Sequence, residues 1–184
     1  MNEPGSQPAV KPLLLQGSVL TQPPTRAKVW GTLMVALLLS LLPWHDQTLW
    51  LAPDFVLMVL LYWNIYAPRL AGLGMAFGLG LVIDVAHGVL MGLNALAYCA
   101  ASLAVLAVRR RLENFDVPRR TVQVAPILLA KEVLVLGIGL MAGRDNVDWR
   151  WLAAGLVAGL LWMPLAWLLD RLCGRPGLTG KAAE

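Results

Sequence analysis

Residues 62–96 constrain the fold of this chain more than any other segment. Apolar residues and glycines run through the segment almost without a break, yet Asp84 and His87 lie near the end of one hydrophobic stretch. A helix of a soluble domain would alternate polar with apolar residues, because one of its faces meets water. A membrane span needs no such alternation, and it keeps an acid only for a specific reason. The segment therefore indicates a polytopic membrane protein.

The composition of the whole chain agrees with this class. Of its 184 residues, 58% are hydrophobic and only 14% are charged, and the mean hydropathy is +0.65. Typical globular domains carry about a quarter charged residues. The net charge of +4 does not indicate nucleic-acid binding, because the arginines cluster at the ends of hydrophobic segments. The two cysteines, Cys99 and Cys173, fall near different segments, and neither has metal-ligand spacing around it.

Hydrophobic segments predict an all-α bundle of about six transmembrane helices. The first three are shorter than the ~20 residues that a helix needs to cross the hydrocarbon of a bilayer. The predicted spans are residues 28–42, 53–66, 70–84, 89–108, 122–142 and 151–169. They divide the chain into a disordered tail (1–25), a six-helix transmembrane domain (26–172) and a short C-terminal tail (173–184).

The lysines and arginines predict the orientation of this domain. With the N-terminus in the cytoplasm, the inner loops and tails hold twelve of the fifteen lysines and arginines. The outer loops hold only Arg144 and Arg150, and Lys131 lies within a span. Cytoplasmic loops of membrane proteins carry such an excess. We therefore expect both termini and both tails to be cytoplasmic.

Glycines recur at four-residue spacing in several spans. The pairs are Gly74 and Gly78, Gly88 and Gly92, and Gly155 and Gly159. Small residues at this spacing allow the backbones of two membrane helices to approach closely. We favour packing within the bundle as their role. The alternative is that one such face receives a helix of another protein.

Several polar residues lie in or beside the spans. Asp54 follows Pro53 and is expected to cap a helix at the outer water interface. Asp84 and His87 share one face of the third span, and Asn94 and Tyr98 share one face of the fourth. We expect these four groups to hydrogen-bond one another and so to tie the two spans together. The alternative is that they line a path for protons or a ligand.

Lys131 and Glu132 fall in the middle of the fifth span. As neighbours in a helix they point about 100° apart, so we expect them to face different partners. An unpaired charge at that depth is costly. We therefore predict that Lys131 pairs with Asp84 across helices, and that Glu132 finds another partner or is protonated.

The densest basic feature consists of five arginines on either side of a short loop. We expect them to orient the protein and to contact anionic lipid headgroups, and docking of a cytoplasmic partner is the alternative. These residues are Arg109, Arg110, Arg111, Arg119 and Arg120. The sequence contains no phosphate-binding loop, no metal-binding motif and no serine with a base at a recognisable spacing, so neither a cofactor nor a catalytic residue is expected.

A series of residues after position 25 resembles the MreD family of rod shape-determining proteins. The similarity lies in the order and spacing of short motifs along the first four spans and the last one. They are Leu42–Pro43–Trp44, Ala52–Pro53–Asp54, Val56–Leu57, Leu60–Leu61–Tyr62–Trp63, Pro68–Arg69, then Gly74, Phe77, Gly78, Asp84, Gly88, Gly92 and Ala95–Leu96, and finally Leu160–Leu161–Trp162 with Pro164.

The resemblance implies a non-enzymatic component of the bacterial elongation machinery in the inner membrane. It implies a fold similar to that of the substrate-binding subunits of vitamin transporters of the ECF type. It also implies binding to MreC, association with RodA, its penicillin-binding transpeptidase and MreB, and control of peptidoglycan synthesis and rod shape.

Three functions remain open from the sequence. The first is a scaffold that binds and positions partners in the membrane. The second is a small-molecule-binding subunit of a transporter, with Asp84, His87, Asn94 and Tyr98 around the ligand. The third is an intramembrane enzyme that uses Asp84 or Glu132 as its acid or base, for which a second catalytic group is not evident.

Overall fold

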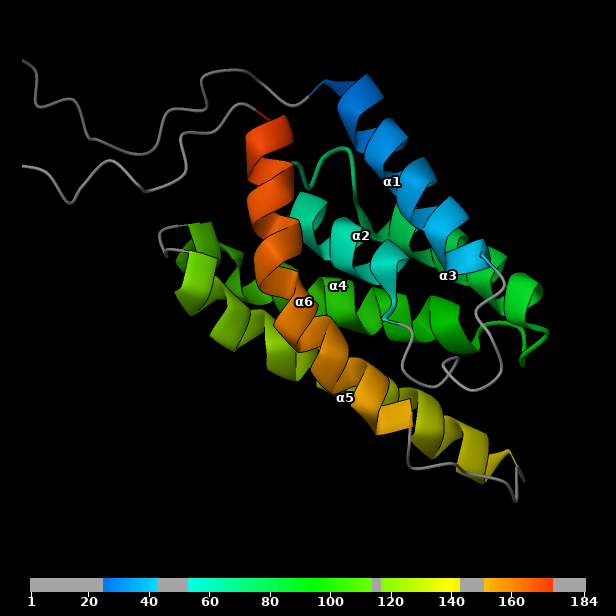
Figure 1. Cartoon of the computed structure of the whole chain (residues 1–184). Helices are drawn as coiled ribbons and strands as arrows, with labels where there is room; N and C mark the ends of the chain where they lie inside the picture. The colour runs from blue at the N-terminus through cyan, green and yellow to red at the C-terminus, as the bar shows by residue number, and fades with distance from the viewer. Residues whose placement is uncertain (1–24, 43–52, 114–116, 143–150, 174–184) are drawn as a thin grey trace, which may run out of the picture.

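The computed structural model describes residues 25–42, 53–113, 117–142 and 151–173, and within them the chain forms six α-helices and no β-strand (Figure 1). The helices are α1 (Arg26–Leu41), α2 (Phe55–Tyr66), α3 (Leu73–His87), α4 (Leu93–Glu113), α5 (Val117–Met141) and α6 (Trp151–Leu172). The predicted all-helical class is confirmed. The two predicted tails lie outside the described residues, apart from Thr25 and Cys173.

Helix α2 lies at the centre of the bundle. It packs against α1, α3, α4 and α6, and Figure 1 shows it between α1 and α6. All ten residues from Val56 to Ile65 are buried. Its 12 residues span about 18 Å at 1.5 Å per residue, which is less than the thickness of the hydrocarbon. Helix α2 is therefore too short to cross the hydrocarbon alone, and the burial of Val56 and Leu57 shows that the neighbouring helices enclose its start.

Helix α1 is attached to the bundle along one apolar stripe. Val29, Leu33 and Ala36 are its buried residues, and they recur at helical spacing on one face. One polar contact supplements this packing, because the indole Nε1 of Trp63 donates to Thr32 Oγ1 at 2.8 Å. The contact joins α1 to the central helix α2.

Helices α3 and α4 form a tightly packed hairpin. A Cβ atom on Gly80 would lie only 2.4 Å from the Cα of Ala95, so only glycine allows this approach. Gly88 ends α3 in the left-handed conformation, with φ of 60°. Helix α4 starts at Leu93 and not at residue 89 as predicted, because the residues between Gly88 and Leu93 form the turn of the hairpin.

Helices α5 and α6 pack side by side along their length (Figure 1). Helix α5 starts five residues before the predicted span, so the basic segment after residue 116 is helical as well. Pro118 occupies the first turn, where a missing N–H costs no helical hydrogen bond. Pro126 and Pro164 lie inside α5 and α6 respectively.

Within the described residues, three helices are long and apolar enough to cross a bilayer, namely Leu93–Leu112 in α4, Pro118–Met141 in α5 and Leu152–Leu172 in α6. Helices α2 and α3 are apolar but shorter. These helices support a membrane protein. The count of six spans stays a prediction, as does the likeness to vitamin-transporter subunits.

Candidate functional site

Asp84, the acid at the end of the predicted third span, caps the start of helix α4. Its carboxylate oxygens accept hydrogen bonds from the backbone N–H groups of Gly92 (2.9 Å), Asn94 (2.8 Å) and Ala95 (3.3 Å). The side-chain amide of Asn94 donates a fourth bond, at 3.0 Å. The N-terminus of a helix carries partial positive charge, so this position suits a carboxylate. Asp84 therefore closes the α3–α4 hairpin and has no need of a lysine.

A second polar group, here called the Asp54–Lys131 network, joins α2, α4 and α5. The Nζ atom of Lys131 lies 3.1 Å from Asp54 Oδ2 and donates to Glu132 Oε1 at 3.0 Å. The hydroxyl of Tyr98 lies 2.6 and 2.7 Å from the two oxygens of Asp54. Asp54 also caps α2 by accepting from the N–H of Leu57 at 3.0 Å. The network thus anchors the start of the central helix.

The predicted pairing of Lys131 with Asp84 is wrong, because Lys131 pairs with Asp54. The carboxylate of Asp84 is already compensated by the start of α4, whereas Asp54 offers Lys131 an enclosed carboxylate at the start of α2. The expected separation of Lys131 from Glu132 is also wrong. The long lysine side chain bends to reach its neighbour, although the two Cα–Cβ bonds diverge.

The four polar groups expected to tie the third span to the fourth separate into different sites. Asp84 and Asn94 bond each other as predicted. Tyr98 bonds Asp54 on α2, and His87 is exposed at the end of α3. Asp54 caps its helix as predicted, but its side chain is only 14% exposed because neighbouring helices enclose it.

Sequence analysis missed the polar contacts that tie α2 to α4 and α6. The hydroxyl of Tyr62 donates to Asp170 Oδ1 at 2.7 Å, and the amide of Asn64 donates to Ser102 Oγ at 2.9 Å. All four side chains are buried. Asp170 precedes a basic tail, and the other three side chains lie one helical turn or more from any charged residue in the sequence. No local sequence pattern therefore identifies the partners of these four side chains.

Two of the five arginines at the end of α4 and the start of α5 also contact α2. The Nε atom of Arg109 donates to the backbone carbonyl of Ile65 at 2.8 Å, and the guanidinium of Arg120 lies 5.3 Å from the centre of the Tyr66 ring. A cation near the last carbonyls of a helix is favourable because these groups carry partial negative charge. Arg110, Arg111 and Arg119 are exposed.

The glycine pairs differ in what surrounds them. Added Cβ atoms on Gly155 and Gly159 would contact α5 at 3.1 and 3.0 Å, so this pair packs within the bundle. Added Cβ atoms on Gly74 and Gly78 would meet no atom within 4 Å, and both residues are exposed on α3.

Gly88 and Gly92 lie in the α3–α4 turn, with φ of 60° and 97°, and not at a helix–helix contact. The pair therefore serves the conformation of the turn, because residues with a Cβ rarely adopt such angles. Along the glycine-rich helix α3, the close approach to a neighbouring helix occurs at Gly80.

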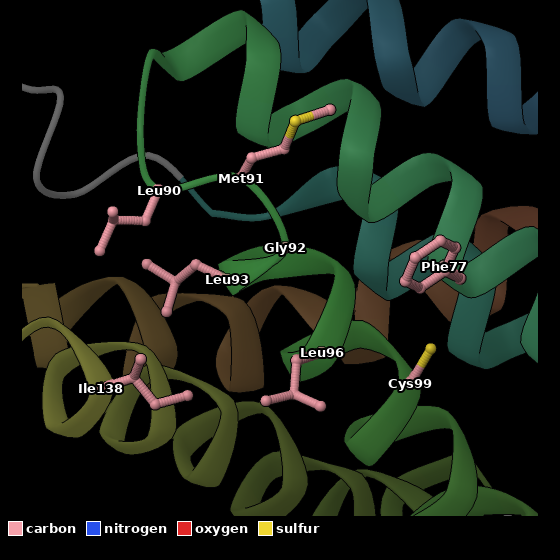
Figure 2. Close-up of a pocket in the computed structure, with 8 residues that line it drawn as sticks. All are labelled: Phe77, Leu90, Met91, Gly92, Leu93, Leu96, Cys99 and Ile138. Carbon is pink, nitrogen blue, oxygen red and sulfur yellow. The ribbon is translucent and has the colours of Figure 1, made fainter. Parts of the chain in front are cut away.

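An apolar groove of about 400 Å³ lies beside the exposed glycines. Figure 2 shows the groove between the α3–α4 turn and α5, with Phe77 on the α3 side and Ile138 on the α5 side. It is open to the surroundings of the bundle, and its lining contains no charged side chain. The lining residues are Phe77, Leu90, Met91, Gly92, Leu93, Leu96, Cys99 and Ile138.

Among the described residues, no three His, Cys, Asp or Glu side chains come together as a metal site would require. The polar side chains of the network and of the hairpin are bonded to one another, and none of them lines the groove. The arrangement offers packing surfaces and a rigid interior.

Comparison with known proteins identifies the family. The model of the rod shape-determining protein MreD family matches residues 26–172, which are the residues of the six-helix domain. The MreD protein of Haemophilus influenzae is 26% identical over 146 residues, covering 77% of this chain and 90% of that protein. No solved structure matches the chain. With its long apolar helices, the chain is a membrane protein that belongs to the MreD family and has a role in determining rod shape.

Proposed function

We propose that this protein is a non-enzymatic scaffold of the bacterial inner membrane that binds MreC and thereby helps to control peptidoglycan synthesis. The observation that carries the proposal is the exposed surface formed by Gly74, Gly78 and the apolar groove, here called the α3–α4 face. RodA, its penicillin-binding transpeptidase and MreB are further proposed members of the same assembly. The charge distribution of the sequence supports cytoplasmic termini.

The α3–α4 face suits a single transmembrane helix. Helices associate in lipid through close packing, because the hydrophobic effect does not drive them together there. Gly74 and Gly78 lie within about 100° of Phe77 around α3, at 100° per residue, so the open glycine surface adjoins the groove. A partner helix seated on the glycines can place its side chains in the groove. MreC, whose single membrane helix the family resemblance brings alongside, is the proposed occupant.

The use of the buried polar groups supports a scaffold over the alternatives. A small-molecule-binding subunit predicts that Asp84, His87, Asn94 and Tyr98 converge on one cavity, and these groups instead serve separate sites. An enzyme predicts an acid or base with access to a substrate. Asp84 is engaged by four N–H donors, and Glu132 is engaged by Lys131. These side chains therefore stabilise the bundle.

Photo-crosslinking in native membranes tests the proposed face. Probes at Phe77 and Leu96, which are 50% and 55% exposed on the face, are expected to capture MreC. A probe at Met34, 55% exposed on α1, serves as the control and is expected to capture lipid only. Capture of MreC at Met34 alone, or at none of the three positions in a well-expressed protein, would contradict the proposal.

The substitution Gly78→Leu tests the same face without a probe. It is expected to weaken MreC binding on the order of tenfold or more, because the leucine holds the partner backbone away. The bundle should remain folded, since a Cβ at Gly78 meets no atom within 4 Å. Gly31→Leu on α1 is the matched control, because Gly31 is equally open. Copurification with MreC and thermal unfolding in detergent measure the two effects.

A further inference from the structure

Basic residues are concentrated where α4 ends and α5 begins. Segment 109–120 holds five arginines and two acidic residues, Glu113 and Asp116, which gives a net charge of +3 within 12 residues. Only residues 114–116 separate the two helices, so both groups of arginines lie at the same end of the bundle. Such a density of positive charge attracts anions of the surroundings.

The structure divides these arginines into two sets with different roles. Arg109 and Arg120 contact the end of α2, through the Ile65 carbonyl and the Tyr66 ring. Arg110, Arg111 and Arg119 are exposed. The first set holds the central helix in place, and Arg111 and Arg119 present their charges to the surroundings of the bundle.

The exposed arginines directly adjoin exposed apolar surface. On α4, Leu103 is 53% exposed two turns before Arg110, and on α5, Val122 is 75% exposed three residues after Arg119. In a membrane-spanning bundle, exposed apolar side chains contact the hydrocarbon of lipids, and long basic side chains extend from there to the interface. The change from apolar to basic surface places these arginines at the depth of lipid headgroups.

We propose that Arg111 and Arg119 form a binding surface for the headgroups of anionic phospholipids, here called the α4–α5 tip. The guanidinium group matches the geometry of a phosphate oxygen pair and binds it through two parallel hydrogen bonds. Basic side chains beside a membrane are also attracted to the negative charge of anionic lipids. The apolar surface next to the tip provides a place for the acyl chains of the same lipid.

Lipid titration of the purified full-length protein tests this surface. Native mass spectrometry of the protein in detergent gives its apparent affinity for phosphatidylglycerol, with phosphatidylcholine and inorganic phosphate as comparison ligands. The double variant Arg111→Gln/Arg119→Gln is expected to bind phosphatidylglycerol on the order of tenfold more weakly. The reason is that each arginine near an anionic headgroup adds a similar amount to the free energy of binding. Its thermal unfolding without lipid should match that of the unmodified protein, because both side chains are exposed.

The matched control is Arg26→Gln/Arg69→Gln, which removes two other exposed arginines outside the tip. This control is expected to retain most of the affinity for phosphatidylglycerol. Equal losses in the two double variants would overturn the proposal, because binding would then follow overall charge. Equal affinity for phosphatidylcholine, or full competition by inorganic phosphate, would also overturn it, since neither result requires an anionic lipid.

Discussion

At the scale of residues, the chain compensates its buried charges in two different ways. Asp84 receives four N–H donors from the start of α4, so a helix terminus balances its charge. Asp54 has a true counter-ion in Lys131, and the hydroxyl of Tyr98 completes its shell. Neither carboxylate is left to be neutralised by solvent, which explains how acids persist among apolar helices.

The Asp54–Lys131 network should be sensitive to loss of a single partner. Lys131→Met leaves two enclosed carboxylates without their cation and is expected to lower the free energy of unfolding by about 3–5 kcal/mol. In the double variant Asp54→Asn/Lys131→Met, the loss should be smaller than the sum of the two single losses, because the variant removes both members of the pair. Thermal or denaturant unfolding in detergent gives the free energy of unfolding of the unmodified protein, the two single variants and the double variant.

A second double-mutant comparison, with Asp84 in place of Asp54, is the control for this prediction. Asp84→Asn and Lys131→Met should be additive within about 0.5 kcal/mol, since the two side chains share no hydrogen-bond partner in the structure. A large coupling between Asp84 and Lys131, with none between Asp54 and Lys131, would show that the assignment of the ion pair is wrong.

At the scale of elements, glycines with the same spacing have different roles. Gly80 and the pair Gly155 and Gly159 bring helices together within the bundle, whereas Gly74 and Gly78 leave an open surface on α3. Helix α3 therefore has one face closed by α4 and another face available to a partner. The distinction depends on the rotation of each helix about its own axis.

Alanine substitutions on α3 should separate the two faces. Gly80→Ala is expected to destabilise the protein by about 1–3 kcal/mol or more, because its Cβ would overlap the backbone of Ala95. Gly74→Ala should be neutral or slightly stabilising, since alanine favours helix by about 1 kcal/mol and meets no neighbour there. Thermal unfolding of the two variants in detergent gives the comparison, and equal effects would contradict the packing described for α3.

At the scale of the whole molecule, the bundle is organised around a helix that is too short to cross the membrane alone. Side chains from four other helices hold α2 and its N-cap, through Thr32 on α1, Arg109 on α4, Lys131 on α5 and Asp170 on α6. The α3–α4 face lies outside these contacts. The molecule thus combines a rigid, polar-bonded interior with an apolar surface open to the bilayer.

Rod-shape complementation should distinguish the interior from the surface. In rod-shaped cells that lack their own MreD, Lys131→Met is expected to fail together with a fall in protein level, because destabilised proteins are degraded. Gly78→Leu is expected to fail at a normal protein level, since it blocks a partner and leaves the bundle folded. Microscopy and immunoblotting give the two readouts. Rod shape restored by Gly78→Leu would contradict the scaffold role of the α3–α4 face.

The sequence by itself determined the class of the protein and the approximate course of its helices. Continuous apolar segments interrupted by glycine, proline and charge predicted an all-helical membrane protein, and each of the six helices overlaps its predicted segment. The pairing of Asp84 with Asn94 was also predictable, because the two residues flank a short turn. These features depend on local spacing, which a sequence contains directly.

Only the tertiary structure decided the partner of Lys131 and the roles of the glycine pairs. Apolar residues surround the axis of a membrane helix almost completely, so the sequence does not indicate which face turns inward. A lysine side chain is also long enough to reach several neighbouring helices. Its choice of Asp54 over Asp84 follows from the position of α2 at the centre of the bundle and from the saturation of Asp84 by α4.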